Sequence, residues 1–377
     1  MNPPGRPKDE YRSAQHEGSP VSPMGRPEGE YRSAQHEGSP VTHPVAQPAL
    51  LLGARVPKRF VERLAARFDV LGPLPPPFPA SAAALPAADA QRVRVLVTMG
   101  TVATTRDAIA CLSSLGLICC VGSGYEGVDL AAARERGILV THSPGANASA
   151  VADLAVALLV ASVRQVFAAN AFLRRGDWSG NYAKRVPLVR GLTGRKVGIY
   201  GLGAIGGKIA RRAAAFETEI GYHNRRRRPD VDYRYFDTLL ALATWADVLV
   251  VAVRADAGNR HAVDAGVLAA LGAEGHVVNI ARGSVIDEAA LMAALRDGVI
   301  AGAGLDVYEH EPAVPEDLQA LPNVALTPHI GGGTLEAQAA MQDMVSANID
   351  AFVAGRPVPT PVPGTPATYA AAPAAVD

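Results

Sequence analysis

The stretch KVGIYGLGAIG, residues 196–206, decides the fold of this chain. It opens with a short apolar run typical of a buried strand, and Gly201, Gly203 and Gly206 follow in the spacing GxGxxG. The Ala-rich residues 207–216 predict a helix directly after the glycines. A strand, a glycine turn and a helix in this order indicate a site for a dinucleotide pyrophosphate. The glycines allow the backbone to approach the phosphates, and the helix N-terminus offers free N–H groups.

Apolar runs alternate with helical patterns on both sides of this turn. Strands are expected at residues 49–56, 93–98, 117–121, 138–141, 220–222, 247–253, 276–280, 302–307 and 324–326. Helices are expected at residues 58–68, 103–114, 127–136, 287–296 and 335–353. The alternation predicts an α/β fold with doubly wound parallel sheets. Residues 147–175 predict one long helix whose first half is apolar around most of its circumference, so we expect it to be buried between domains or against a partner subunit.

Length and charge limit the classes of protein. A chain of 377 residues suggests two domains. Lys plus Arg and Asp plus Glu both number 36, and a net charge of zero argues against nucleic acid or an anionic membrane as the main partner. No apolar run has the roughly 18 residues of a membrane span, and the polar N-terminus does not resemble a signal peptide. With Cys119 and Cys120 as buried free thiols, we expect a cytoplasmic protein.

Both ends of the chain are predicted to lie outside the folded part. Within residues 1–47, GRPKDEYRSAQHEGSPV recurs after 20 residues as GRPEGEYRSAQHEGSPV. This segment has too few large apolar side chains to fold, so we expect disorder. A docking tail and a neutral duplication both remain open as explanations of the repeat. The Pro- and Ala-rich residues 356–377 are expected to fray.

The end of the second strand after the glycines bears on the choice of cofactor. An NAD site usually places an acidic side chain about 20 residues past the glycines, against the ribose hydroxyls. Here Asn224 stands at that place, followed by four arginines, of which Arg225 and Arg226 come first. Because guanidinium groups pair well with phosphate, we predict NADPH as cofactor, with NADH possible. A solvated turn is the alternative explanation of the arginines.

Candidate catalytic side chains follow three other strands. Arg282, Glu311 and His329 each lie just past a predicted strand. Together they suffice for reduction of a carbonyl by a nicotinamide: His329 donates the proton, a carboxylate favours the protonated imidazole, and Arg282 binds the substrate carboxylate. Taken singly, each is also compatible with a structural role. The glycine-rich turns after the earlier strands add candidate substrate contacts, namely Met99, Gly100, Ser123 and Gly124.

Six stretches in the same order carry a family resemblance. They are GSGYEGVDLAAARERGI (122–138), VADLAVALLVA (151–161), GRKVGIYGLGAIG (194–206), VVNIARGSVIDEAAL (277–291), AGLDVYEHEP (303–312) and TPHIGGGT (327–334). Through them, residues 93–348 resemble the D-isomer-specific 2-hydroxyacid dehydrogenases. The resemblance assigns the active site to Arg282, Glu311 and His329, and a contact with the nicotinamide amide to Asp306. The expected cofactor contacts are Gly201, Leu202, Gly203, Ala204, Ile205, Gly206, Asn224, Arg225, Arg226, Ile280, Ala281, Arg282, Asp306, His329 and Gly331.

The resemblance also implies an architecture and a reaction. It implies a flavodoxin-like substrate domain (48–144 and 328–355), an inserted Rossmann dinucleotide-binding domain (145–327), and a homodimer formed through residues 147–175. The stretch YHNRRRRP is similar to the NADPH-preferring glyoxylate/hydroxypyruvate reductases, so we expect reduction of small 2-keto acids and no metal. A dehydrogenase using NAD on another substrate and a weakly catalytic nucleotide-sensing scaffold are the alternatives. Arg254 departs from the family pattern and is expected either to narrow the adenosine side of the cleft or to join the phosphate site.

Overall fold

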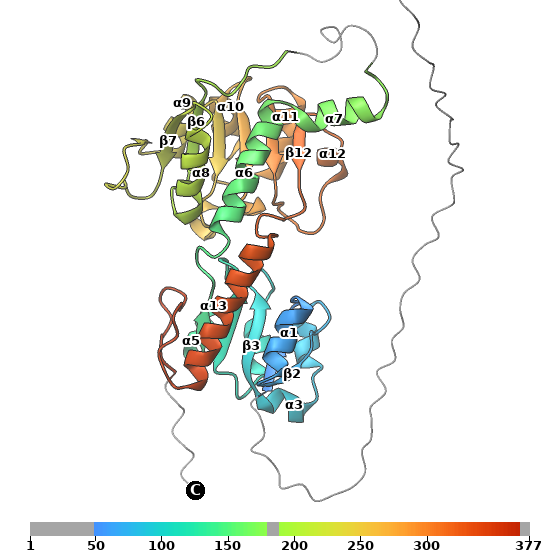
Figure 1. Cartoon of the computed structure of the whole chain (residues 1–377), viewed down its shortest axis with the longest axis vertical. Coiled ribbons are helices and arrows are strands. Elements are labelled where there is room, and N and C mark those ends of the chain that lie inside the picture. The colour runs from blue at the N-terminus through green and yellow to red at the C-terminus, as the bar shows by residue number, and fades with distance from the viewer. Residues whose placement is uncertain (1–48, 179–187, 370–377) are drawn as a thin grey trace, which may run out of the picture. The chain divides into compact units, whose positions relative to one another are not determined.

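Short apolar runs form the strands of two parallel sheets (Figure 1). The computed structural model describes residues 49–178 and 188–369, and these residues belong to one compact unit. The repeat-bearing residues 1–47 therefore lie outside the described residues. Strands and helices alternate along the chain, and every strand pair is parallel. The predicted α/β class with two doubly wound sheets is confirmed.

The first sheet has five strands in the order β2-β1-β3-β4-β5, a flavodoxin-like arrangement. Its strands are β1 (Ala49–Leu52), β2 (Asp69–Leu71), β3 (Val93–Met99), β4 (Leu117–Val121) and β5 (Leu139–Thr141). Its helices are α1 (Lys58–Ala65), α2 (Phe78–Ala83), α3 (Ala87–Arg92), α4 (Arg106–Ala110) and α5 (Leu130–Glu135). The last helix of the chain, α13 (Leu335–Val353), returns to this sheet, where Met341 and Val345 share a buried cluster with Leu117.

The second sheet has seven strands in the order β12-β11-β10-β9-β6-β7-β8, the Rossmann order with one strand added at the edge. Its strands are β6 (Lys196–Tyr200), β7 (Glu219–His223), β8 (Arg234–Tyr235), β9 (Val248–Val251), β10 (His276–Asn279), β11 (Gly302–Leu305) and β12 (Val324–Leu326). Its helices are α6 (Ala148–Val163), α7 (Val166–Arg174), α8 (Ala204–Ala214), α9 (Leu239–Trp245), α10 (Ala265–Leu271), α11 (Glu288–Arg296) and α12 (Glu316–Gln319).

Helices cover both faces of the second sheet. Side chains of α6 and α8, such as Leu158 and Ile209, pack on one face against Val197 and Val278. Side chains of α9 to α11, such as Leu242 and Leu268, pack on the other face. Every residue of β9 and β10 is buried, as expected for central parallel strands covered on both sides. The carboxyl ends of the strands are left to the connecting loops, which is where ligands bind in such sheets.

The predicted helix 147–175 is wrong as a single element. It divides into α6 and α7, which meet at a bend of 66°. Gln165, at the junction, has a left-handed backbone with φ of 50°, which interrupts the run of helical hydrogen bonds. The α6 half is buried as predicted, whereas no residue of α7 is buried.

The expectation that the chain frays after residue 355 is also wrong as far as residue 369. Val358 and Val362 are buried, and Pro361 forms an antiparallel bridge with Thr141. The Thr360 hydroxyl donates to the His142 carbonyl, and the Asn348 amide donates to that hydroxyl. Two well-placed valines and one threonine thus fix a segment whose composition suggests a free tail. Residues 370–377 lie outside the described residues.

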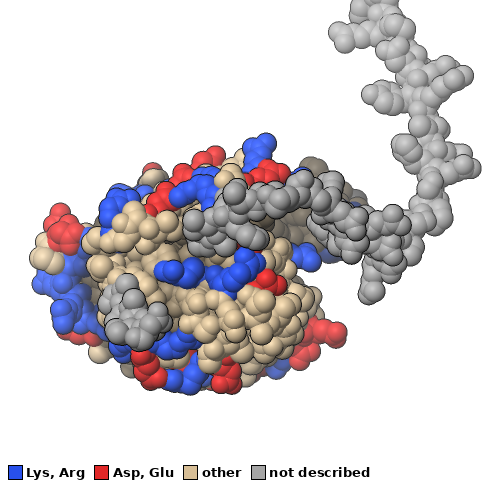
Figure 2. Space-filling model, turned by 90° about the horizontal axis from the view of Figure 1, so that it is seen from below, with Lys and Arg blue, Asp and Glu red and all other residues tan. Residues whose placement is uncertain are grey.

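Two further features bear on surfaces. On the face shown in Figure 2, basic and acidic side chains are interspersed rather than separated into large areas of one sign. Among the described helices, none alone has the length and hydropathy of a membrane span. The bent pair α6 and α7 passes that test only when the two are taken together.

Candidate functional site

The glycine turn joins β6 to α8 with almost no room for side chains. Gly201 has φ of +103°, and a Cβ there would lie 2.5 Å from the Val253 backbone. A Cβ on Gly206 would collide with the carbonyl oxygen of Gly201, so this glycine lets the helix lie against the turn. Gly203 instead faces open space. The helix begins at Ala204, three residues earlier than predicted, so its N-terminal N–H groups start directly at the glycines.

A cavity of about 790 Å³ opens beside this turn, and we call it the turn cavity. It is lined by Tyr200, Gly201, Leu202, Gly203, His223, Asn224, Arg225, Arg226, Ala252, Val253, Arg254, Asp256, Gly258 and Asn259. The ends of β6, β7 and β9 thus meet around one space, at the point where the strand order reverses. A dinucleotide binds at this point in doubly wound sheets. Open space at Gly203 and a free helix N-terminus suit a pyrophosphate there.

The polar residues at the end of β7 divide into two groups. Asn224 turns inward, and its side-chain oxygen accepts a hydrogen bond of 2.6 Å from the Leu202 N–H. Arg228 also turns back, since it donates to the Leu202 carbonyl oxygen and pairs with Asp230. Arg225 and Arg226 are exposed and line the turn cavity. Arg225 has one weak partner, the Asp256 carboxylate at 3.9 Å. The two arginines predicted to lie nearest a phosphate are therefore the two of this run that line the cavity.

Arg254 reaches out of the second sheet toward the first. Its guanidinium carbon lies 4.6 Å from the ring centroid of Tyr125, in the loop after β4. Its carbonyl oxygen accepts a hydrogen bond of 2.7 Å from the Asn259 side chain. Arg254 also lines the turn cavity, so both expectations for this residue stay predictions.

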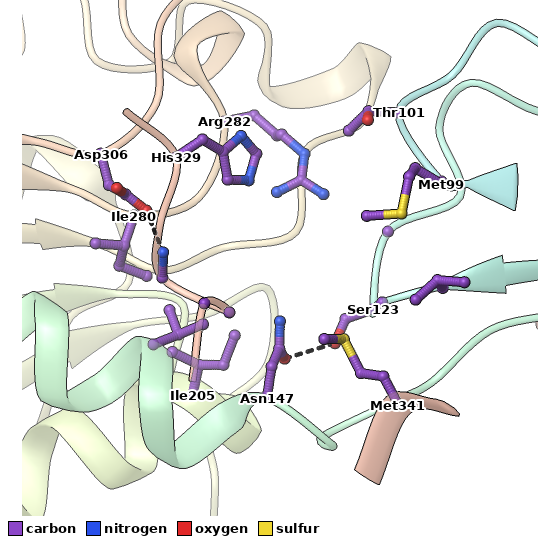
Figure 3. A pocket seen from close by; sticks show the side chains of 18 of the residues that line it. Met99, Thr101, Ser123, Asn147, Ile205, Ile280, Arg282, Asp306, His329 and Met341 are labelled. Atoms are coloured by element: carbon purple, nitrogen blue, oxygen red, sulfur yellow. Dashed lines mark hydrogen bonds between the residues drawn. The ribbon is translucent and has the colours of Figure 1, made fainter. Parts of the chain in front are cut away.

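A second cavity, of about 300 Å³, lies where loops from the two sheets meet, and we call it the histidine cavity (Figure 3). Loops of the first sheet contribute Met99, Gly100, Thr101, Val121, Gly122, Ser123 and Gly124. The other lining residues are Asn147, Val151, Ile205, Ile280, Arg282, Asp306, His329, Gly331, Gly332, Gly333, Gln338 and Met341. All five predicted substrate contacts are among the lining residues. Asn147, Gln338 and Met341 were not predicted, because no local pattern marks a side chain that reaches a cavity from a helix end.

His329 and Glu311 form a hydrogen-bonded pair at this cavity. The Nδ1 atom of His329 lies 2.6 Å from Oε2 of Glu311, and the Tyr308 N–H donates to Oε1 at 3.1 Å. Burial raises the pKa of Glu311, but the hydrogen bonds from His329 and Tyr308 and the nearby positive charge, that of Arg282 included, together outweigh it, so its pKa lies below the ordinary value. The carboxylate is therefore charged at neutral pH and fixes the imidazole, which can exchange a proton at Nε2.

Asp306 fixes the loop that carries His329. It is buried, and its carboxylate accepts hydrogen bonds from the Thr327 hydroxyl at 2.7 Å, the Ile330 N–H at 2.8 Å and the Gly331 N–H at 2.9 Å. The His329 N–H donates to the Asp306 carbonyl oxygen at 2.9 Å. Asp306 also lines the histidine cavity. Its role in holding this loop was not predicted, since the partners lie more than 20 residues away along the chain.

Arg282 follows β10 and is held on two sides. Its Nη1 atom donates to the Ala281 carbonyl oxygen at 2.7 Å, and Nε pairs with the carboxylate of Glu126. Gly124 lies under this pair, where a Cβ would collide with Nη2 of Arg282. Glu126 was not predicted from the sequence.

The predicted cofactor contacts thus divide between the two cavities. Gly201, Leu202, Gly203, Asn224, Arg225 and Arg226 line the turn cavity. Ile205, Ile280, Arg282, Asp306, His329 and Gly331 line the histidine cavity. Ala204, Gly206 and Ala281 line neither cavity. Within the described part of the chain, no group of three or more His, Cys, Asp or Glu side chains could hold a metal ion.

Comparison with known proteins shows similarity to 2-hydroxyacid dehydrogenases and to reductases of 2-keto acids. Residues 156–331 match the model of the D-isomer specific 2-hydroxyacid dehydrogenase, NAD binding domain. A glyoxylate/hydroxypyruvate reductase of Arabidopsis thaliana is 40% identical over 270 residues, covering 72% of this chain and 85% of that protein. A 2-ketogluconate reductase of Gluconobacter oxydans is 40% identical over 273 residues, covering 72% of this chain and 87% of that protein.

A solved structure is similar across both sheets. It is an NADPH-dependent glyoxylate/hydroxypyruvate reductase of Sinorhizobium meliloti in complex with NADP and malonate. The two chains are 39% identical with a TM-score of 0.79, over 87% of this chain and 100% of the other.

Proposed function

Because the chain belongs to the D-isomer specific 2-hydroxyacid dehydrogenases, and is therefore an NAD(P)-dependent oxidoreductase, we propose that it reduces glyoxylate and hydroxypyruvate with NADPH. Hydroxypyruvate then gives a D-2-hydroxy acid, whereas glyoxylate gives glycolate, which has no stereocentre. The observation that carries the proposal is the convergence of Arg282 and His329 on one cavity of about 300 Å³, with Glu311 outside its lining but hydrogen-bonded to His329. The names of the similar reductases support small 2-keto acids as the substrate class.

Three side chains perform the chemistry in this proposal. A bound reduced nicotinamide supplies a hydride to the carbonyl carbon. Arg282 binds the substrate carboxylate and polarises the carbonyl. His329 gives a proton from Nε2 to the carbonyl oxygen as the C–H bond forms, and becomes neutral imidazole. Glu311 stabilises the protonated form of His329 beforehand and holds Nδ1, so that Nε2 is the atom that donates.

The preference for NADPH rests on the end of β7. No acidic side chain follows this strand directly, and Asn224 is hydrogen-bonded to the glycine turn. Arg225 and Arg226 line the cavity and can pair with a 2′-phosphate. NADH remains usable in this arrangement, because the glycine turn and the helix N-terminus bind the pyrophosphate of either cofactor.

The domain bounds also form part of the proposal. We assign residues 48–144 and 328–355 to the substrate domain and residues 145–327 to the dinucleotide-binding domain. The strands of the two sheets fall within these ranges, and α13 packs on the first sheet. Residues 356–369 join the substrate domain, since Pro361 pairs with Thr141.

We further propose that the protein is a homodimer formed through α6 and α7. Helix α7 has no buried residue, and Val166, Phe167 and Leu173 are about half exposed, as is Trp178 just after it. Apolar side chains gathered on one helix are typical of an oligomer interface. Light scattering of the purified chain should give twice the monomer mass, and Phe167→Glu should lower this mass.

A cytoplasmic location stays a prediction, supported by the free thiols of Cys119 and Cys120.

An assay of the purified protein tests the proposal. NADPH and NADH oxidation are measured with glyoxylate, hydroxypyruvate, pyruvate and phenylpyruvate. Fast turnover of glyoxylate and hydroxypyruvate with NADPH supports the proposal. Preference for NADH means that the arginines are a solvated turn, and absence of turnover with every pair favours a nucleotide-sensing scaffold.

A further inference from the structure

Glu126 contacts the proposed substrate-binding arginine from outside the histidine cavity. The residue lies in the loop after β4 of the first sheet, whereas Arg282 follows β10 of the second. Nε of Arg282 donates to Oε1 of Glu126, across 156 positions of sequence. About a third or less of each side chain is exposed. This ion pair is a direct link between the two sheets at the site.

The contacts of Arg282 leave one end of the guanidinium for a ligand. Nε is engaged by Glu126, and Nη1 donates to the Ala281 carbonyl oxygen. A guanidinium is planar, so two fixed nitrogens set the direction of the third. Figure 3 shows the guanidinium between His329 and Met99, with its terminal nitrogens directed into the cavity. An incoming carboxylate therefore meets a donor that is already oriented.

Glu126 contacts the guanidinium at Nε, whereas Nη1 is bonded to the Ala281 carbonyl oxygen. It lines a separate cavity of about 580 Å³ together with Arg260, Glu309 and Glu311, and Arg282 lines both cavities. Glu126 is not among the described residues that line the histidine cavity. Its carboxylate thus pairs with Arg282 without lining the cavity proposed for the substrate.

The loop is shaped to bring these groups together. A Cβ on Gly124 would collide with Nη2 of Arg282 and would lie 2.6 Å from Oε2 of Glu126. Gly100 in the neighbouring loop is equally restricted, since a Cβ there would collide with the Gly124 carbonyl oxygen. Glycine at both positions lets the arginine and the glutamate lie against the backbone of the substrate loops.

We propose that Glu126 is a positioning residue for carboxylate recognition: it holds Nε of Arg282 so that the terminal nitrogens face the substrate. The inference rests on the proposed role of Arg282 as the carboxylate-binding residue. Arginine has many rotamers, and fixing it before binding removes an entropic cost that each substrate would otherwise meet. The opposite idea is that Glu126 competes with the substrate for Arg282. The two ideas predict opposite changes in affinity when the glutamate is removed.

Binding of an unreactive 2-keto acid analogue separates them. The dissociation constant of oxamate is measured by calorimetry on the full chain saturated with NADPH, for the wild type, Glu126→Ala, Glu126→Gln and Glu126→Asp. If Glu126 positions Arg282, the Ala and Gln variants bind oxamate at least about ten-fold more weakly. Aspartate keeps the charge with a shorter reach, so it should restore part of the affinity.

A matched control removes a similar ion pair elsewhere. Glu135 pairs with Arg106 on the surface of the same domain, and Glu135→Gln should leave oxamate binding unchanged. Retained NADPH binding shows that each variant is folded, and Gln, which preserves volume, replaces Ala if the latter fails this criterion. Unchanged or tighter binding in the Glu126 variants overturns the positioning role while the proposed function stands. A wild type that binds NADPH but no 2-keto acid analogue overturns the proposed function, and this inference with it.

Discussion

Oε2 of Glu311 lies 2.6 Å from Nδ1 of His329, although the two residues follow different strands of the second sheet. The carboxylate is also held by the Tyr308 N–H, so its position does not depend on the imidazole alone. One side of His329 is thereby committed to a fixed anion. The other side is left to exchange a proton with a ligand in the histidine cavity.

The first prediction concerns this pair. Glu311→Gln should lower kcat for glyoxylate by about ten-fold to a hundred-fold, because a neutral amide no longer stabilises the protonated imidazole. The pKa of Glu311 lies below its ordinary value of 4.5, so the wild-type carboxylate is charged throughout the neutral range where kcat is measured. Glu309→Gln is the matched control two residues away. Equal losses in both variants would contradict a specific role for Glu311.

The second prediction concerns cofactor choice. Arg225→Ala combined with Arg226→Ala should raise KM for NADPH by at least about a hundred-fold, since each charge-assisted hydrogen bond contributes about 1.5–3 kcal/mol and two are lost. KM for NADH should change little, because NADH has no 2′-phosphate. Arg227→Ala, an exposed arginine of the same run outside the cavity lining, serves as the control. Parallel changes for both cofactors would show that the arginines do not read the phosphate.

The third prediction concerns the loop that carries His329. Asp306→Asn replaces a carboxylate that accepts three hydrogen bonds with an amide, in which one accepting oxygen becomes a donating NH2 group. At least one main-chain N–H therefore loses its partner. We expect a loss of about 2–3 kcal/mol in the free energy of unfolding and a lower kcat. Urea denaturation and steady-state kinetics measure the two effects. Full stability with full activity would show that the loop does not depend on this carboxylate.

The fourth prediction concerns pH and stability. Burial is the main cause that lowers the pKa of His276 to about 4, and Nδ1 of this residue lies 2.9 Å from the Ser162 hydroxyl oxygen. The unfolded chain binds the proton near pH 6.5 and the folded chain near pH 4. The contribution of neutral His276 to the free energy of unfolding is therefore fully present above about pH 6.5 and is lost as the pH drops toward 4.

The size of that change can be measured. Between pH 7.5 and pH 5, His276 should account for a loss of about 2 kcal/mol in the free energy of unfolding. His276→Gln, which keeps a hydrogen-bonding side chain without a titrating ring, should remove this part of the pH dependence. The control is His310→Gln, an exposed histidine. An identical pH dependence in His276→Gln and the wild type would contradict the assignment.

Local sequence was sufficient for the glycine turn and for the ends of the strands. Gly201, Gly203 and Gly206 act within a few residues of one another, so their spacing, with the apolar run before and the Ala-rich run after them, predicted the turn. Arg282 and His329 could be placed because parallel strands end at one edge of a sheet. The bend between α6 and α7 was not predictable in this way. Gln165 interrupts the long helix with neither proline nor glycine in its place.

Contacts between distant segments account for most of the remainder. The pairing of Glu126 with Arg282 joins loops of two sheets, and no periodic pattern relates them. Asn224 lines the turn cavity, but the hydrogen bond that its side-chain oxygen accepts from the Leu202 N–H follows from no local pattern. Val358 and Val362 pack the C-terminal segment although its composition suggests a free tail. Each case depends on which surfaces meet in the folded chain.

The most direct test of the central claim is the steady-state turnover of His329→Ala with NADPH and glyoxylate, beside the wild type. NADPH binding is followed by fluorescence in the same samples. If His329 is the proton donor, kcat falls by about a hundred-fold to ten-thousand-fold while the affinity for NADPH is kept within a few-fold. Turnover near the wild-type rate, with cofactor binding intact, would contradict the mechanism and the assignment of this cavity as the active site.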